Sequence, residues 1–209
     1  MEGFLAPAYG ERSLGDVVPA VGRALGVTVP TDPAGAVAPG GLVLPEAPSY
    51  VVFLVDGLGT RLLERYAHAA PYLSSLRSAA PTATAGVPST TATSLTSLGT
   101  GLVPGAHGVV GFTSRIPGTD RLLNALFWDK DVDPLEWQPH PTAFAGLRSA
   151  GVSVTVVNKR EFGGSGLTVA AHRGADYVGA DKVGERIAAA VAASALPPLP
   201  PLLGGGLLQ

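Results

Sequence analysis

A short, continuously apolar run at residues 50–55 is the feature that most constrains the fold of this chain. Its sequence, Tyr-Val-Val-Phe-Leu-Val, combines β-branched and aromatic residues without a polar interruption. Such a run suits a strand that is buried on both faces, as in a parallel sheet between layers of helices. Asp56 and Gly57 follow at once, and Gly59 comes soon after, so the chain can leave the strand sharply. The run therefore predicts a sheet strand that ends in a carboxylate.

The segments around this run alternate between expected helices and expected strands. Apolar periodicity, Ser, Thr or Asp caps and Gly stops predict helices at about 13–25, 61–68, 71–76, 91–98, 141–150 and 181–194. Further strands are expected at 152–157 and 176–178, and a hairpin-like excursion at 109–112 and 122–127. This alternation predicts an α/β fold with a mostly parallel sheet flanked by helices.

The amino-acid composition excludes some classes of binding partner and bears on the cellular compartment. The chain has 209 residues, of which 46% are hydrophobic and 14% charged, and its net charge is −2. Nothing in this balance resembles a polyanion-binding surface, so we expect no docking of nucleic acid, although a nucleotide-sized substrate is compatible. No apolar run is long enough to cross a membrane and no secretory signal is visible, so we expect no membrane partner. The absence of cysteine excludes disulfides, thiolate zinc sites and cysteine nucleophiles, and fits a cytoplasmic protein.

The last residues, 196–209, differ from the rest of the chain. They are apolar, rich in Pro, Gly and Leu and without period, and no charged residue follows Arg186. Prolines at this density forbid a regular helix and disfavour a central strand. We expect an irregular tail, of the kind that an incomplete chain or a shifted reading frame would give.

Asp56 is the first candidate for chemistry. Ligands of open α/β sheets bind beyond the carboxyl ends of the strands, where this residue is expected. A carboxylate there suits a divalent metal such as Mg²⁺, Mn²⁺ or Zn²⁺. The alternative is that Asp56 caps the helix that follows, and the residue alone does not decide between the two.

A run of hydroxyl side chains is the second candidate. Six of the eight positions from 89 to 96 are hydroxyl residues: Ser89, Thr90, Thr91, Thr93, Ser94 and Thr96. At a helix N-terminus the free backbone N–H groups and the helix dipole favour an anion such as phosphate. A hydroxyl in that position can attack phosphorus if a bound metal lowers its pKa. Ordinary helix capping is the alternative, because Ser and Thr are common N-caps.

The histidines and the glycine-rich loop give weaker signals. His107 precedes Gly108, and a histidine in such a dipeptide is more often structural than a ligand. His68, His140 and His172 show no metal-binding spacing, so each is interpreted as a surface or core residue. The loop at 163–166 lacks the Gly-Lys-Ser/Thr ending of a phosphate loop.

Four motifs taken together resemble a known family. Their order and internal spacing, Asp56-Gly57, Pro88-x-x-Thr91, Thr100-Gly101 and His107-Gly108, are similar to those of the nucleotide pyrophosphatase/phosphodiesterase branch of the alkaline phosphatase superfamily. The resemblance covers roughly residues 8–195 and rests most firmly on 50–112. It implies an alkaline-phosphatase-like fold in which residues 1–195 form the N-terminal part of a single domain that is incomplete at its C-terminus.

The resemblance also implies roles for individual residues. Members of this family bind two divalent metals, usually Zn²⁺, and use a Thr or Ser nucleophile in a phospho-enzyme mechanism. By position, Thr91 matches the nucleophile, and Asp56 together with Thr91 matches the ligands of the metal that activates it. Ser94 stands where the family commonly has a substrate-binding Asn. Thr90 and Thr93 are neighbours that a misalignment of one or two residues would promote.

The chain departs from the family pattern at other positions. Ser94 replaces an Asn, and Phe112 stands where well-studied members have a second Asn that helps to hold the phosphoryl oxygens. The remaining metal ligands of the family come from an Asp-x-x-x-His segment, an Asp-His pair and a late His. Asp176, Asp181 and His172 do not form these motifs. One carboxylate and one hydroxyl hold a divalent ion poorly against water.

These observations lead to two functional hypotheses. The first is a metal-dependent phosphodiesterase or nucleotide pyrophosphatase that acts on a small phosphoester or nucleotide-type substrate, with this chain truncated and weakly active or inactive. The second is a non-catalytic module that keeps an anion pocket for binding or assembly. Thr91 in place of a cysteine argues against a sulfatase. The sequence makes no prediction of the oligomeric state.

Overall fold

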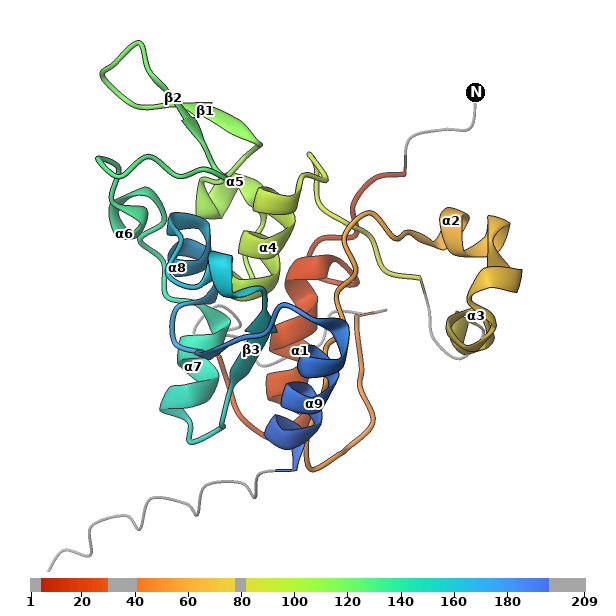
Figure 1. Ribbon diagram of the computed structural model, residues 1–209. Coiled ribbons are helices and arrows are strands. Elements are labelled where there is room, and N and C mark those ends of the chain that lie inside the picture. The colour runs from red at the N-terminus through yellow and green to blue at the C-terminus, as the bar shows by residue number, and fades with distance from the viewer. Residues whose placement is uncertain (1–4, 30–40, 78–81, 196–209) are drawn as a thin grey trace, which may run out of the picture.

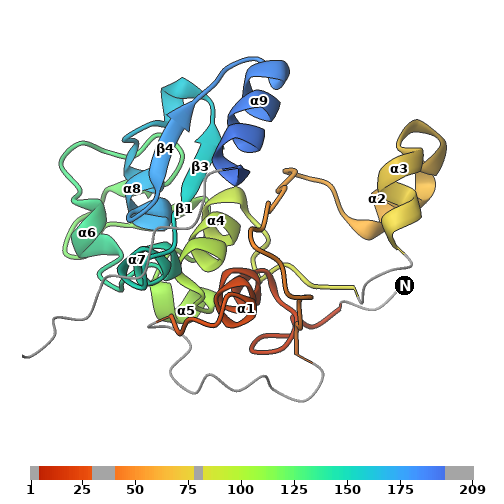
Figure 2. The same ribbon diagram turned by 90° about the horizontal axis from the view of Figure 1, so that it is seen from below.

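The computed structural model describes residues 5–29, 41–77 and 82–195, and helices dominate this part of the chain. Figures 1 and 2 show the arrangement of the elements. The helices are η1 (Leu14–Asp16), α1 (Val17–Ala24), α2 (Thr60–Arg65), η2 (Ala67–Ala69), α3 (Pro71–Leu76), α4 (Thr91–Thr100), α5 (Pro104–His107), α6 (Pro134–Trp137), α7 (Ala143–Ser149), η4 (Arg160–Phe162), α8 (Gly166–His172) and α9 (Val183–Ser194). The strands are β1 (Thr113–Arg115), β2 (Leu122–Asn124), β3 (Thr155–Asn158) and β4 (Asp176–Gly179).

Helix α4 forms the centre of the molecule. It packs against η1, α1, α5, α7 and α8, and most of its side chains are buried. Leu98 belongs to a core cluster that it shares with α1 and α7, and Ala92 belongs to a second cluster with Val109 and Leu167. Apolar burial is the main stabilising term in folding, so the position of α4 between the two clusters fixes it firmly. The candidate nucleophile therefore stands at the first residue of the best-anchored helix.

Two small sheets account for all the strands of the described residues. β1 pairs with β2 in an antiparallel hairpin, and β3 pairs with β4 in a parallel ladder with Val156 opposite Tyr177. Helix α9 packs on β3. The prediction of an α/β fold is thus confirmed in part: the hairpin and the parallel pair are present, but a large parallel sheet does not occur among the described residues.

Residues 50–55 do not form the strand that the sequence predicts. Among the described residues this segment has no sheet partner, and every side chain from Val51 to Gly59 is exposed. Phe53 is 76% exposed. The prediction of a buried strand here is wrong for a physical reason: β propensity is local, whereas a strand forms only against a hydrogen-bonding neighbour, and the described part of the chain places none beside this run.

The expected helices are present, with differences at their ends. The last helix begins at Val183 with Lys182 as its N-cap, so the expected cap at Asp181 is wrong. Asp181 instead pairs with Arg160 at 3.3 Å. Leu62 of α2 is 45% exposed, and Tyr66, the C-cap of that helix, is 46% exposed. The α2–α3 arm that carries them stands away from the body in Figures 1 and 2.

Some predictions fall on residues that the structure does not describe. The irregular tail expected at 196–209 lies outside the described residues. The assignment of residues 1–195 to one domain stays a prediction. Within the described ranges, no helix combines the length and the apolar character that spanning a membrane requires.

Candidate functional site

The start of α4 is fixed by a hydrogen-bonded cap that involves two of the candidate hydroxyls. Thr90 is the N-cap, in extended conformation, and its Oγ1 accepts from the backbone N–H of Thr93 at 3.4 Å. The same Oγ1 donates to Thr93 Oγ1 at 2.9 Å. Thr93 is fully buried. Both side chains are engaged in holding the helix start, which is the usual work of an N-cap.

Most of the remaining hydroxyls on this helix are also structural. Thr96 Oγ1 donates to Ala92 O at 2.8 Å, and Thr100 Oγ1 donates to Thr96 O at 2.7 Å. Both side chains are fully buried in the core. A buried Ser or Thr in a helix satisfies its hydroxyl in this way, on the carbonyl of the preceding turn. The hydroxyls of Thr96 and Thr100 therefore serve the packing of α4.

Thr91 is the hydroxyl that faces the predicted carboxylate. Its Oγ1 donates to Asp56, at 3.2 Å from Oδ2 and 3.4 Å from Oδ1. Asp56 does not cap the next helix, because α2 begins at Thr60 with Gly59 as its N-cap. The sequence left two interpretations of Asp56 open, a metal ligand or a helix cap. The structure does not support the helix cap. The contact joins two residues that are far apart in sequence.

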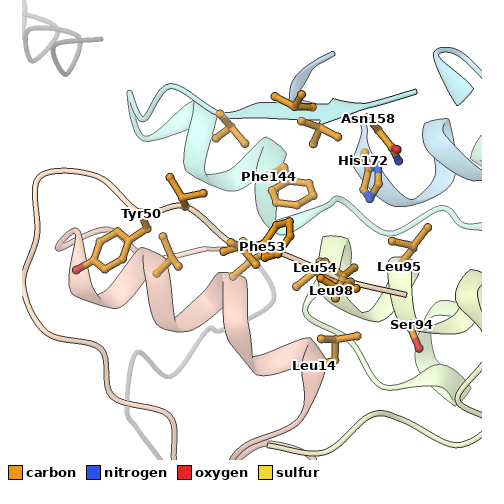
Figure 3. A pocket seen from close by; sticks show the side chains of 18 of the residues that line it. Leu14, Tyr50, Phe53, Leu54, Ser94, Leu95, Leu98, Phe144, Asn158 and His172 are labelled. Atoms are coloured by element: carbon orange, nitrogen blue, oxygen red, sulfur yellow. The ribbon is translucent and has the colours of Figure 1, made fainter. Parts of the chain in front are cut away.

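Ser94 lies one turn beyond Thr91 on the same side of α4. Asp56, Thr91 and Ser94 line one open groove, with Ser89 at its edge. Figure 3 shows Ser94 on the α4 wall of this groove, below Leu95 and Leu98. The structure thus brings together the three residues that the sequence selects. The groove also contains His172, which the sequence interprets only as a surface or core residue, and nothing in its local sequence signals this position.

The His107-Gly108 dipeptide has a structural role. His107 is 1% exposed, and its Nδ1 accepts from the backbone N–H of Val109 at 3.1 Å. Because Nδ1 is an acceptor, the neutral ring carries its proton on Nε2, which lies 2.9 Å from Ser97 Oγ and donates to it. Burial lowers the pKa of His107 from 6.5 to about 4. This ring ties α5 to α4 from below the site and is not free to bind a metal.

Two buried histidines predict a pH-dependent stability. Burial also lowers the pKa of His172 from 6.5 to about 4, so both rings are neutral in the folded chain at neutral pH. Above about pH 6.5 neither state is protonated at these rings, and between about 6.5 and 4 only the unfolded chain binds the protons. We therefore expect the free energy of unfolding to decrease as the pH is lowered from about 6.5 to about 4, by up to about 1.4 kcal/mol per pH unit for each ring.

Urea unfolding at several pH values between about 7 and 4.5 measures this slope. His107→Gln removes one of the two rings and should flatten the slope, although it also lowers stability overall. His68→Gln is the matched control, because His68 is exposed. An unfolding free energy that does not change across this window, or an equal slope in the His107 variant, would contradict the prediction.

The described residues do not by themselves fit a two-metal centre. Within residues 5–29, 41–77 and 82–195 no group of three or more His, Asp or Glu side chains comes close enough to hold a metal ion. Asp176 pairs with Arg148 at 2.6 Å and Asp181 with Arg160, so these carboxylates are used elsewhere. Asp56 and Thr91 offer one carboxylate and one hydroxyl, whereas a catalytic zinc takes three protein ligands.

The glycine-rich loop at 163–166 is a helix start and not a phosphate loop. Ser165 caps α8, with its Oγ 3.3 Å from the backbone N of Thr168. Gly166 packs so closely on Trp128 that an added Cβ would lie 2.0 Å from the indole ring. The interpretation of this segment as a structural loop is therefore supported by close packing, which requires the glycine.

Comparison with known proteins adds one match. No curated protein and no solved structure matches the chain. The sequence model of a family described as type I phosphodiesterase / nucleotide pyrophosphatase matches residues 50–195, which is more than half of the chain and includes Asp56, Thr91 and Ser94. The match agrees with the resemblance seen in the sequence motifs, and on this evidence the chain belongs to the type I phosphodiesterase/nucleotide pyrophosphatase family.

Proposed function

We propose that this chain carries the nucleophile of a metal-dependent phosphodiesterase or nucleotide pyrophosphatase, and that the nucleophile is Thr91. The observation that carries the proposal is the hydrogen bond from Thr91 Oγ1 to Asp56, 3.2 Å long, at the mouth of an open groove in a chain of this family. Thr90 and Thr93 are engaged in the cap, which supports Thr91 over its neighbours.

The contact with Asp56 suits a nucleophilic attack on phosphorus. A carboxylate that accepts from the hydroxyl orients its oxygen and can take its proton as the new bond forms. In the proposed step, a bond forms between Thr91 Oγ1 and phosphorus, the bond from phosphorus to one ester or anhydride oxygen breaks, and that group leaves with the bonding electron pair while the threonine proton passes to Asp56. The other half of the substrate stays bonded through phosphorus to Thr91 Oγ1. Water then attacks phosphorus, the bond between phosphorus and Oγ1 breaks, Asp56 returns its proton to the threonine oxygen, and one proton of the water passes to solvent.

The start of α4 also suits a negatively charged substrate. The helix has ten residues and its N-terminus carries partial positive charge, which stabilises a phosphoryl group held against it. Ser94 stands one turn further along and offers a hydroxyl to the same groove. We assign it to substrate binding. A small phosphoester or nucleotide-type substrate fits this arrangement.

The proposal includes features that lie outside the described residues. Metal dependence, with Zn²⁺ as the expected ion and Asp56 as one ligand, requires further ligands from other parts of the protein. The larger, mostly parallel sheet of the superfamily would likewise extend the β3–β4 pair. We therefore propose that the chain as it stands is truncated and weakly active or inactive.

The experiment combines a zinc titration by calorimetry with hydrolysis of bis(p-nitrophenyl) phosphate. We expect zinc to bind this chain with a dissociation constant of about 10⁻⁴ M or weaker, because affinity rises with the number of charged ligands, and we expect little or no turnover. Asp56→Asn should remove the residual binding. Asp120→Asn, at an exposed carboxylate paired with Arg115 in the β1–β2 hairpin, is the matched control and should not.

Tight binding of two metal ions together with multiple turnovers would overturn the truncation. A different pattern, in which the chain binds inorganic phosphate at α4 and forms no covalent adduct on Thr91 with any metal added, would favour the non-catalytic module. The observation that keeps this second function open is the small number of metal-binding side chains near Asp56 among the described residues.

A further inference from the structure

The segment that leads into the candidate nucleophile, residues 82–89, forms one wall of the groove. Most of its residues line the groove together with Asp56 and Thr91. No residue of this approach segment belongs to a helix or a strand, and an isolated bridge between Thr84 and Ser13 is its one piece of regular pairing. A segment that lacks a hydrogen-bond ladder of its own depends on other parts of the chain for its position.

The N-terminal segment of the chain holds the approach segment in place. Leu14 N donates to Thr84 O at 2.9 Å, and Thr84 N donates to Arg12 O at 2.8 Å. Ala8 N donates to Thr84 Oγ1 at 2.8 Å. Helix η1, which follows these residues, packs against α4. The red N-terminal coil therefore contacts both the approach segment and the helix that carries Thr91 (Figure 1).

Tyr9 holds the end of the approach segment that leads into α4. Its Oη accepts a hydrogen bond from Val87 N at 2.9 Å. The tyrosine also packs on the backbone of Gly86, where an added Cβ would lie 3.3 Å from Oη and 3.7 Å from Cε1. Pro88 follows and has no N–H, so Val87 offers the last backbone donor before Ser89. The Tyr9 hydroxyl thus fixes the backbone immediately before the groove residue Ser89.

We propose that Tyr9 is a positioning residue for substrate binding: its hydroxyl holds Val87 and Ser89 as the wall that contacts the organic group of a phosphoester. The proposal rests on the proposed function, because this wall stands beside the candidate nucleophile. Tyr9 is not among the described residues that line the groove, so it acts through the backbone of its neighbours and does not touch the substrate.

The position of Thr91 does not depend on this contact. Thr91 belongs to α4, which the two core clusters anchor. Loss of the Tyr9 hydroxyl should therefore loosen the wall for the organic group and leave the helix start, where the phosphoryl group is held, unchanged. Tyr9 precedes residues 50–195, which match the family model, so the family match assigns it no role.

The test compares two ligands of the full chain by NMR titration. Inorganic phosphate occupies the start of α4 alone, whereas p-nitrophenyl phosphate adds an organic group. Tyr9→Phe keeps the ring and removes only the hydroxyl. We expect this variant to bind p-nitrophenyl phosphate about fivefold more weakly, the effect of one lost hydrogen bond, and inorganic phosphate with unchanged affinity. A general loss of folded protein would affect both ligands alike.

Tyr72→Phe is the matched control, because Tyr72 is 73% exposed on α3 and does not line the groove. It should change the affinity for neither ligand. Hydrogen exchange at the Val87 N–H is a second readout that needs no ligand. This N–H should exchange about fivefold faster or more in Tyr9→Phe, because its acceptor is lost, and at an unchanged rate in the control.

Equal affinity of the Tyr9→Phe variant and the unaltered chain for p-nitrophenyl phosphate overturns the positioning role, and so does unchanged exchange at Val87. Either result, with phosphate binding intact, leaves the proposed function standing. If the unaltered chain binds neither ligand, both proposals fail. In a form of the protein that has the complete metal site, Tyr9→Phe should raise KM for bis(p-nitrophenyl) phosphate about fivefold at an unchanged kcat. A lower kcat at an unchanged KM contradicts the role.

Discussion

Gly99→Ala is expected to lower the free energy of unfolding by about 3 kcal/mol or more, the upper end of overpacking effects in cores. A Cβ on Gly99 would lie 1.7 Å from the carbonyl oxygen of Ala171 and 2.8 Å from its carbon. These are backbone atoms of α8, so no side-chain rotation relieves the clash and the two helices must move apart. Their separation would disturb the core on both sides of α4.

Urea unfolding of the variant measures this loss. Gly105→Ala is the matched control, because Gly105 is also a helical glycine and an added Cβ there meets no atom within 4 Å. The control should be neutral or stabilise by up to about 1 kcal/mol, the usual gain of alanine over glycine in a helix. A domain is stable by only about 5–15 kcal/mol, so the loss at Gly99 is large. Equal stability of the two variants would show that α4 and α8 do not pack as described.

The helices could be predicted from the sequence because their signals are local. Thr142 caps α7 through a hydrogen bond from the backbone N–H three residues ahead. Helix α8, which Ser165 caps in the same way, is not among the predicted helices. The expected helices at 91–98 and 141–150 correspond to α4 and α7. Caps and apolar periodicity act within one or two turns, so a single sequence contains them. The parallel pairing of β3 with β4 follows from two separate β-rich runs near one another in the chain.

The strand at residues 50–55 could not be predicted correctly for the opposite reason. Its composition favours a β conformation, but pairing depends on a neighbour elsewhere in the chain or in another chain. The described residues place β3 across an open groove from this run and not beside it. A sequence indicates that a segment prefers the β conformation, but it does not identify the neighbouring strand with which that segment would pair.

The candidate site was partly predictable. The sequence selects Asp56, Thr91 and Ser94. The structure places Asp56 in contact with Thr91 and Ser94 in the same groove, whereas the roles of these residues stay predictions. Which of the hydroxyls are buried was not predictable, because Thr93 and Thr96 differ from Thr91 only in the direction that they face. That direction depends on how α4 rotates against its neighbours. Packing, which is non-local, therefore decides which hydroxyl remains available for chemistry.

Thr91→Ala is expected to reduce phosphodiester hydrolysis by about 10⁴-fold or more in a form of the protein that has the complete metal site, because loss of a nucleophile removes the covalent route. Thr91→Ser keeps the hydroxyl beside Asp56 and should retain measurable activity. Initial rates with bis(p-nitrophenyl) phosphate give the fold-change. Mass spectrometry of acid-quenched samples detects the p-nitrophenyl phosphoryl adduct on the nucleophile, which the alanine variant cannot form at this position.

Thr90→Ala separates loss of the nucleophile from loss of the helix start. Thr90 caps α4, so its removal should cost about 1 kcal/mol of stability without abolishing the chemistry. Thr91→Ala should show the reverse, with near-normal stability and no turnover, since Thr91 Oγ1 donates to the exposed Asp56 carboxylate and does not cap the helix. Unchanged activity in Thr91→Ala would rule out Thr91 as the nucleophile. Loss of the phosphorylated peptide in Thr90→Ala alone would move the role to its neighbour, because only the residue that bonds to phosphorus can carry the adduct.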